Sequence, residues 1–257
     1  MRKVSEIVSQ KNTQIKLLRK LALKKYRRQR SQFTVENLAI IYDALKSGQG
    51  FTGLFVTENF IQKNREKFEF LQTHSSIESY YLIDEELNKC YSQLDTPSGI
   101  TAIYDIKHKP LDKNKSVIYL NGLRDPGNIG TIMRTALAFD VPNVVLDSTC
   151  VDRYNFKSIN AAKDAIFKVN IWEDKDGSWL ENKKNVLSIY VANSHNGVHL
   201  SKVQNEKPFC LILGNEAHGV SNELIQLAEK EIYIPISKEI ESLNVSAAAA
   251  ILLYQLR

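Results

Sequence analysis

The 257-residue chain is long enough for one large domain or two of ordinary size, and its 43% apolar and 25% charged residues are typical of a globular protein. Its longest apolar stretch, residues 247–254, falls far short of the roughly 20 residues that cross a bilayer, and no signal peptide is visible. The three cysteines lie far apart, without the spacing of a metal site or a disulfide framework. We therefore expect a cytoplasmic protein with no bound metal and no membrane partner.

The first thirty residues carry a strong positive charge. They hold eleven lysines and arginines against the single acid Glu6, a net charge of +10, whereas the whole chain carries only +5. Such a concentration indicates a polyanionic partner, because each neutralised phosphate releases counterions. A solvated, partly helical leader that only aids solubility is the alternative. We expect residues 1–30 to form a basic leader that contacts nucleic acid through its densest cluster: Lys24, Lys25, Arg27, Arg28 and Arg30.

Residues 31–106 alternate between helical and strand-like patterns. Apolar spacing predicts a helix over 35–46 that ends at Gly48, and Asp84 is a typical N-cap for a helix that runs through residue 90. Between and after them we expect strands over 51–57, 80–83 and 100–106, and a charged helix over 58–71. Residues 107–115 are polar, contain Pro110 and show no periodicity, so we place a linker there. The sequence thus predicts a small α/β domain over 31–106.

Residues 116–257 repeat the alternation with stronger signals. The continuous apolar run of residues 116–120 is typical of a strand buried on both faces of a parallel sheet. Further strands are predicted over 144–146, 165–171, 186–192, 209–213 and 232–236, with helices over 128–139 and 243–256. Strands that alternate with helices indicate an α/β domain with a mainly parallel sheet.

The loop after the strand over 116–120 carries glycines at positions 122, 127 and 130. It lacks the Lys-Ser or Lys-Thr pair of a phosphate-binding P-loop, since Asn128 and Ile129 follow Gly127, and it lacks the G-x-G-x-x-G spacing of a dinucleotide fingerprint. What remains is a tight turn at a helix N-terminus, a generic anion-binding arrangement. Asn128 and Arg134 lie six residues apart, on roughly one face of that helix. A ligand site and a purely structural turn explain this loop equally well.

Two further loops follow later strands. Gly214-Asn215-Glu216 come directly after the buried run of residues 209–213, where open α/β sheets bind ligands, although a glycine turn with an N-cap at Ser221 is the simpler alternative. Later, Ile234-Pro235-Ile236 and a short link lead into Glu241-Ser242-Leu243-Asn244 and a run of alanines. Taken by itself, this last segment favours a capped helix without a ligand.

The order of the three loops is far more specific than any one of them. Together they resemble the SpoU/TrmH family of RNA 2′-O-ribose methyltransferases, in the SPOUT superfamily, through D-P-G-N-x-G-x-x-x-R-T-A at 125–136, G-N-E-x-x-G-x-S at 214–221 and I-P followed by E-S-L-N-V-S-x-A-A-A at 234–250. Residues 25–36 and 96–102 are similar, more weakly, to that family's small RNA-binding domain. The resemblance implies a knotted (trefoil) α/β methyltransferase domain over 116–257, a rare exception to the rule that chains do not thread through loops.

The resemblance also implies S-adenosyl-L-methionine as cofactor, a homodimer formed through the catalytic domain near the helix that starts at Val245, and an RNA substrate, with rRNA favoured over tRNA. The residues implied to line the cofactor site are Leu213, Gly214, Asn215, Gly219, Ile234, Ile236, Leu243 and Ser246. Gly214 would allow close backbone approach. A tRNA methyltransferase and a catalytically silent RNA-binding protein of the same fold are the alternatives.

For catalysis, the resemblance implies that Arg134 activates the ribose 2′-hydroxyl. An arginine is not deprotonated in proteins, so an RNA phosphate could accept the proton while Arg134 holds phosphate and hydroxyl in line. Asn128 is expected to orient Arg134 or the ribose, and Glu216 to pair with Arg134 or to act as the base. Ser242 and Asn244 complete the predicted hydrogen-bond frame.

Two details stand apart from this pattern. The link over residues 237–240 has no glycine, where members of the family that the chain resembles often have one. We therefore expect Lys238 or Glu239 to alter the edge of the pocket, and the sequence does not fix the affinity for the cofactor. His195 and His199 are four apart, as in a zinc-binding helix, but Asn196 and Gly197 stand where such a helix needs Glu and continuity. We interpret both histidines as loop residues. The sequence does not identify the methylated RNA or nucleotide.

Overall fold

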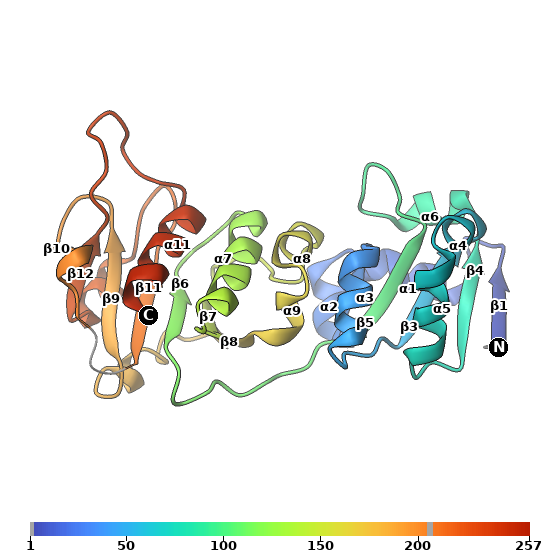
Figure 1. Ribbon diagram of the computed structural model, residues 1–257, viewed down its shortest axis with the longest axis horizontal. Coiled ribbons are helices and arrows are strands. Elements are labelled where there is room, and N and C mark those ends of the chain that lie inside the picture. Colours follow the sequence, from blue (N-terminus) through green and yellow to red (C-terminus); the bar gives the residue numbers. More distant parts are fainter. Residues whose placement is uncertain (1–2, 205–207) are drawn as a thin grey trace. The chain divides into compact units, whose positions relative to one another are not determined.

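The computed structural model describes residues 3–204 and 208–257, so Arg2 of the predicted leader lies outside the described residues. The chain divides into two compact units (Figure 1). Unit 1 comprises Met1–Lys107 and Tyr154–Asn160, and unit 2 comprises His108–Arg153 and Ala161–Arg257. Each unit has its own sheet and its own apolar core.

Unit 1 is built on a mixed five-stranded sheet in the order β1-β4-β3-β5-β2. Strands β1, β4 and β3 are parallel, whereas β5 is antiparallel to both of its neighbours. The strands are β1 (Lys3–Ile7), β2 (Gln32–Val35), β3 (Gly53–Thr57), β4 (Ser79–Ile83) and β5 (Ile100–Asp105), and the helices are α1 (Thr13–Leu21), α2 (Lys24–Arg30), α3 (Leu38–Lys46), α4 (Glu58–Lys63), α5 (Arg65–His74) and α6 (Glu85–Tyr91). As predicted, Asp84 caps α6, accepting a hydrogen bond from the Leu87 backbone N–H at 2.6 Å.

The basic N-terminal stretch is folded into unit 1 and is not a separate leader. Strand β1 pairs with β4 along the edge of the sheet, and α1 buries Ile15, Leu18 and Leu21 in the core. The physical reason is visible in the sequence: these three residues recur at helical spacing, which gives α1 one apolar face while its lysines and arginines stay on the other.

Three predicted elements of the chain differ from the structure. Residues 32–35 form β2, so the helix predicted from residue 35 begins only at Leu38, capped by Asn37. The charged helix predicted over 58–71 is two helices, broken at Asn64, whose side chain donates to the Phe60 carbonyl at 3.0 Å. The strand predicted over 165–171 is a single helical turn, α9 (Ala165–Lys168), followed by β8 (Asn170–Asp174), because a short apolar run fits either element.

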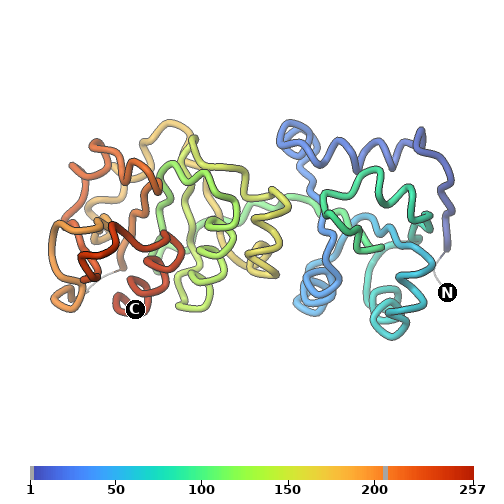
Figure 2. Tube along the Cα trace, turned by 90° about the horizontal axis from the view of Figure 1, so that it is seen from above, coloured from blue at the N-terminus to red at the C-terminus, as the bar shows by residue number. Residues whose placement is uncertain are grey.

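Unit 2 is built on a seven-stranded sheet in the order β10-β12-β9-β11-β6-β7-β8, and every strand pair in it is parallel. Helix α11, red in Figures 1 and 2, packs beside α7, green. The other elements are β6 (Val117–Leu120), α7 (Pro126–Ala138), β7 (Asn143–Asp147), β9 (Ser188–Asn193), β10 (Val198–His199), β11 (Phe209–Leu213), α10 (Asn222–Leu227), β12 (Lys230–Tyr233) and α11 (Val245–Leu256). Helix α8 (Phe156–Ala162) is divided between the units, with its residues 156–160 in unit 1. The predicted α/β class with a parallel sheet is confirmed here.

No helix among the described residues is both long enough and apolar enough to cross a membrane.

Candidate active site

The polar loops of unit 2 meet at one edge of its sheet. Strands β12, β9, β11 and β6 are neighbours and run parallel, so their carboxyl ends lie side by side. The first glycine loop follows β6, the second follows β11, and the segment that leads to α11 follows β12. This is the edge at which open α/β sheets bind ligands.

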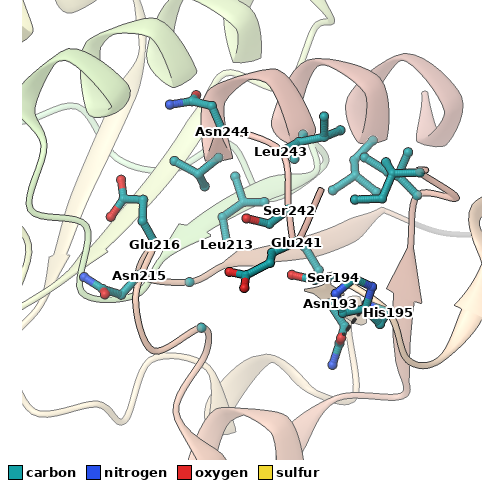
Figure 3. A pocket seen from close by; sticks show the side chains of 18 of the residues that line it. Asn193, Ser194, His195, Leu213, Asn215, Glu216, Glu241, Ser242, Leu243 and Asn244 are labelled. Atoms are coloured by element: carbon teal, nitrogen blue, oxygen red, sulfur yellow. Dashed lines mark hydrogen bonds between the residues drawn. The ribbon is translucent and has the colours of Figure 1, made fainter. Parts of the chain in front are cut away.

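A cavity of about 740 Å³ opens at this edge (Figure 3), which is within the usual size range of small-molecule sites. Seven of the eight residues predicted to bind cofactor line it, and the eighth, Ser246, does not. Ser246 instead donates its hydroxyl to Asn244 Oδ1 at 2.6 Å, inside the first turn of α11. The seven are Leu213, Gly214, Asn215, Gly219, Ile234, Ile236 and Leu243.

The second loop is a tight turn that requires glycine at position 214. Asn215 and Gly219 exchange two backbone hydrogen bonds of 3.0 and 2.8 Å, which folds the loop back on itself. A Cβ atom on Gly214 would lie 2.2 Å from the carbonyl carbon of Gly219 and 2.4 Å from the Val220 nitrogen. Contacts that short do not occur, so any side chain here would force the backbone of the cavity wall to move.

Side-chain amides tie the first loop to the second. Asn215 donates to the Gly122 carbonyl at 2.8 Å, and Asn121 accepts from the Ser221 backbone N–H at 2.9 Å. Asn121 also donates to Asp147 Oδ2 at 2.6 Å, and the same carboxylate oxygen accepts from the Gly122 backbone N–H at 3.0 Å. Asp147, at the carboxyl end of β7, therefore anchors the first loop. It was missed in the sequence because nothing in its own neighbourhood shows which loop it holds.

A chain of hydrogen bonds joins all three motifs. Asn128, at the start of α7, donates to Glu216 Oε1 at 2.7 Å, and its own side-chain oxygen accepts from Asn244 Nδ2 at 3.1 Å. Glu216 and Asn244 line the cavity, and so does Ser242. Three of the five residues predicted to be catalytic thus line the cavity, and Asn128 joins two of them, Glu216 and Asn244.

Arg134, the fifth predicted catalytic residue, is placed differently. It is exposed on α7, does not line the cavity, and has no hydrogen-bond or ion-pair partner within residues 3–204 and 208–257. The pairing with Glu216 that we considered is absent, because Glu216 is bonded to Asn128. The reason is positional: the buried face of α7 carries Ile129, Ile132, Met133 and Ala136, and residue 134 falls outside that face. Its guanidinium needs no partner to offset burial.

Four polar lining residues were not predicted: Asn193, Ser194, His195 and Glu241. The first three stand at the carboxyl end of β9, between β11 and β12, so the strand-end rule that singled out Asn215 could also have found them. Asn193 is held by a hydrogen bond from its side-chain nitrogen to Glu231 Oε2 at 2.7 Å, and its oxygen accepts from the His195 backbone N–H at 3.0 Å. His199 does not accompany His195 at the cavity, and instead accepts from the Ser201 backbone N–H.

The link over residues 237–240 borders a smaller hollow of about 310 Å³ that shares His195, Ile236 and Glu241 with the main cavity. Lys238 and Glu239 line this hollow only. Cys150 lies beneath the first loop, where burial, and then the charge of Asp147, raise the pKa of its thiol to about 12. It is therefore a neutral thiol and not a nucleophile at neutral pH.

In unit 1, the five predicted RNA-binding residues lie on α2, and four of them are exposed: Lys24, Lys25, Arg28 and Arg30. Arg27 is buried, with 4% of its surface exposed. Its Nη1 donates to the carbonyls of Leu21 and Ala22, both at 2.7 Å, at the carboxyl end of α1. Arg27 therefore fixes the junction of two helices, and its charge does not point to solvent as the sequence led us to expect.

Comparison with known families gives two matches that together cover most of the chain. The model of the SpoU rRNA methylase family matches residues 115–254. The model of the MRM3-like substrate binding domain matches residues 12–102.

Individual relatives match over nearly full length. The chain is 30% identical to the 23S rRNA (guanosine(2553)-2′-O)-methyltransferase RlmP of Bacillus subtilis, covering 99% of this chain and 100% of that protein. Among solved structures, a putative RNA methyltransferase of the TrmH family from Porphyromonas gingivalis superposes with a TM-score of 0.82 at 28% identity, over 95% of this chain and 96% of that one. An AdoMet-bound rRNA methyltransferase from Sinorhizobium meliloti has the same fold, with a TM-score of 0.82 at 24% identity over 98% and 97% of the two chains.

Proposed function

This chain belongs to the SpoU rRNA methylase family, and on that premise we propose that it transfers the methyl group of S-adenosyl-L-methionine to a ribose 2′-hydroxyl of ribosomal RNA. The observation that carries the proposal is the hydrogen-bonded series Glu216–Asn128–Asn244, which joins the three motifs at one end of the cavity. The B. subtilis relative supports the choice of ribosomal RNA, since its name specifies 23S rRNA and a 2′-O position.

The residues present suit this cofactor. The cavity combines an apolar wall, formed by Leu213, Ile234 and Leu243, with the polar turn of Asn215–Gly219, which closes tightly because Gly214 has no side chain. We assign the adenosine and methionine portions to that wall, to Ile236 and to the Asn215–Gly219 turn. When bound, the cofactor supplies an electrophilic methyl group on a sulfonium.

The protein's own residues must then align a weakly acidic hydroxyl and provide a route for its proton. The exposed guanidinium of Arg134 offers several donors in a fixed plane, which suits the backbone phosphate and the 2′-oxygen of one nucleotide. In our proposal the phosphate held by Arg134 accepts the proton. Glu216 is held by Asn128 and so orients the frame, with Ser242 and Asn244 completing it.

We assign unit 1 to RNA binding. Four exposed basic residues on α2 provide phosphate contacts, and the match to a substrate binding domain over residues 12–102 supports the same role. We propose accordingly that residues 116–257 are the catalytic part, that residues 31–106 together with the basic stretch before them engage the substrate, and that the polar stretch at 107–115 is the linker.

Three finer features complete the proposal. We propose that the chain after β12 passes through a loop of unit 2 as a trefoil knot, and that the enzyme works in the cytoplasm away from membranes. We also propose a homodimer through α11, whose Ile251 and Tyr254 leave 42% and 61% of their surfaces exposed beside α7. Sedimentation of the protein at micromolar concentration tests the dimer: a mass of one chain contradicts it.

Methyl transfer from labelled S-adenosylmethionine to purified ribosomal and transfer RNA, assayed separately, tests the function. We expect label in ribosomal RNA. Label in transfer RNA alone would show that the substrate is transfer RNA and not ribosomal RNA. Cofactor binding without label in either fraction would favour an RNA-binding protein that has lost catalysis.

A further inference from the structure

The ionisable side chains that line the cavity give its wall a negative charge, and the roles predicted from the sequence do not account for it. Three of its lining residues are ionisable: His195, Glu216 and Glu241. Among the described residues that line it, none is lysine or arginine. With histidine neutral, the wall therefore carries two negative charges and no positive charge.

The two carboxylates have different surroundings. Glu216 lines the cavity and accepts a hydrogen bond from Asn128 at 2.7 Å. Glu241 has no hydrogen bond or ion pair within the described residues, and its carboxylate points into the open space between the 214–219 loop and Ser194 (Figure 3). The one cationic side chain of the 237–240 link, Lys238, lines only the smaller hollow, together with Glu239 of opposite charge. Glu241 is therefore the free negative charge of the cavity.

Methyl transfer changes the charge of the cofactor. S-adenosylmethionine carries an ammonium, a carboxylate and a sulfonium, a net charge of +1. When the ribose oxygen forms its bond to the methyl carbon, the carbon–sulfur bond breaks, its electron pair stays on sulfur, and the hydroxyl proton leaves to a base. S-adenosylhomocysteine, the thioether product, has the same ammonium and carboxylate but no net charge. A fixed negative charge near sulfur favours the first compound and not the second.

We propose that Glu241 lies near the sulfonium of the bound cofactor and makes the cavity selective for that cofactor over its neutral product, so that fresh cofactor replaces the product after each transfer. This inference rests on the proposed function and assigns a specificity role to a residue outside the predicted set. A contact of Glu241 with the ammonium group, which both compounds share, would not produce such selectivity. The two possibilities give different binding results.

Calorimetric dissociation constants for S-adenosylmethionine and S-adenosylhomocysteine, measured on the wild-type protein and on Glu241→Gln, test the proposal. Because Glu241 is exposed and its field is screened by solvent, we expect the substitution to raise the dissociation constant of S-adenosylmethionine about 3- to 10-fold. The dissociation constant of S-adenosylhomocysteine should change less than about 2-fold. Sinefungin, which places an amine near the position of the sulfonium, should behave as S-adenosylmethionine does. Glu239→Gln, on the same link but outside the main cavity, should change none of the three.

Equal weakening of all three compounds by Glu241→Gln would overturn the proposal in favour of an ammonium contact, and no change in any of them would remove Glu241 from recognition altogether. Both results differ from failure of the proposed function, in which the wild-type protein itself would bind neither S-adenosylmethionine nor its product.

Discussion

The cavity edge of unit 2 and the α2 helix of unit 1 hold their polar side chains in opposite ways. At the cavity, Asn128, Asn215 and Glu216 are each fixed by hydrogen bonds of 2.7–2.8 Å to residues far away in the sequence. On α2, lysines and arginines extend into solvent, and only Arg27 is locked into the interior. A site that positions two reactants needs the first arrangement, whereas a surface that attracts phosphates at long range needs only the second.

The largest effect that we expect separates chemistry from binding within unit 2. Arg134→Ala should lower the rate of methyl transfer at least about 100-fold, because the group that aligns the hydroxyl is lost. Cofactor affinity should change less than about 2-fold, since Arg134 does not line the cavity. Arg134→Lys keeps the charge but not the planar donor set and should recover only part of the rate. Near-normal turnover in Arg134→Ala would remove the role that we assign to it.

A second comparison tests how rigidly the cavity wall is built. Gly214→Ala places a methyl group 2.2 Å from backbone atoms, so we expect it to lower the free energy of unfolding by about 1–3 kcal/mol and to weaken cofactor binding. The matched change in unit 1 is Gly50→Ala, whose new Cβ would meet its nearest neighbour at an ordinary 3.7 Å. Thermal unfolding of both variants is the measurement, and equal melting temperatures would show that the 214–219 turn is less constrained than its geometry indicates.

Within α2, two arginines three residues apart should give opposite results. Arg27→Ala leaves the carbonyls of Leu21 and Ala22 without their donor, so we expect a loss of about 1–3 kcal/mol in unfolding free energy. Its RNA affinity should be unchanged at temperatures where the variant remains folded. An RNA-binding defect of the folded Arg27→Ala protein would contradict the structural role.

The smallest effect concerns Arg30, which is exposed on the same helix. Arg30→Ala should leave the melting temperature unchanged and weaken RNA binding a few-fold. The slope of log affinity against log salt should fall by about one, as expected when one phosphate contact is lost. Filter binding at several salt concentrations measures this, and an unaltered slope would place the RNA elsewhere on unit 1.

The sequence predicted the fold best for strands whose two faces are both buried, because such strands must be apolar throughout. Strands buried on both faces, such as Phe209–Leu213, read as continuous apolar runs and were located within a residue or two. The strand predicted from residue 165 was wrong, because the four residues 165–168 are too few to distinguish a helical period from a strand. Residues 3–30 were misplaced because their charge was more conspicuous than the three leucine and isoleucine side chains that α1 buries.

The site shows the same division. The strand-end position of Asn215 and Glu216 indicated a ligand site from the residues alone, whereas the rest of the cavity wall was predicted from the resemblance to the SpoU/TrmH family. The bond from Asn128 to Glu216 spans 88 residues, and the anchoring of Asn121 by Asp147 depends on which strands are neighbours. Neither has a local signal. The exposure of Arg134 and the free carboxylate of Glu241 likewise depend on how α7 and the 237–240 link lie in the fold, which the sequence does not show.

The central claim is the position of the methyl group on the nucleotide. Ribosomal RNA incubated with the protein and S-adenosylmethionine can be digested to nucleosides and analysed by mass spectrometry, with Arg134→Ala as the control. We predict a single new nucleoside whose added methyl group remains with the ribose after the base is cleaved away, absent from the control. A new methyl group that leaves with the base would contradict ribose methylation directly.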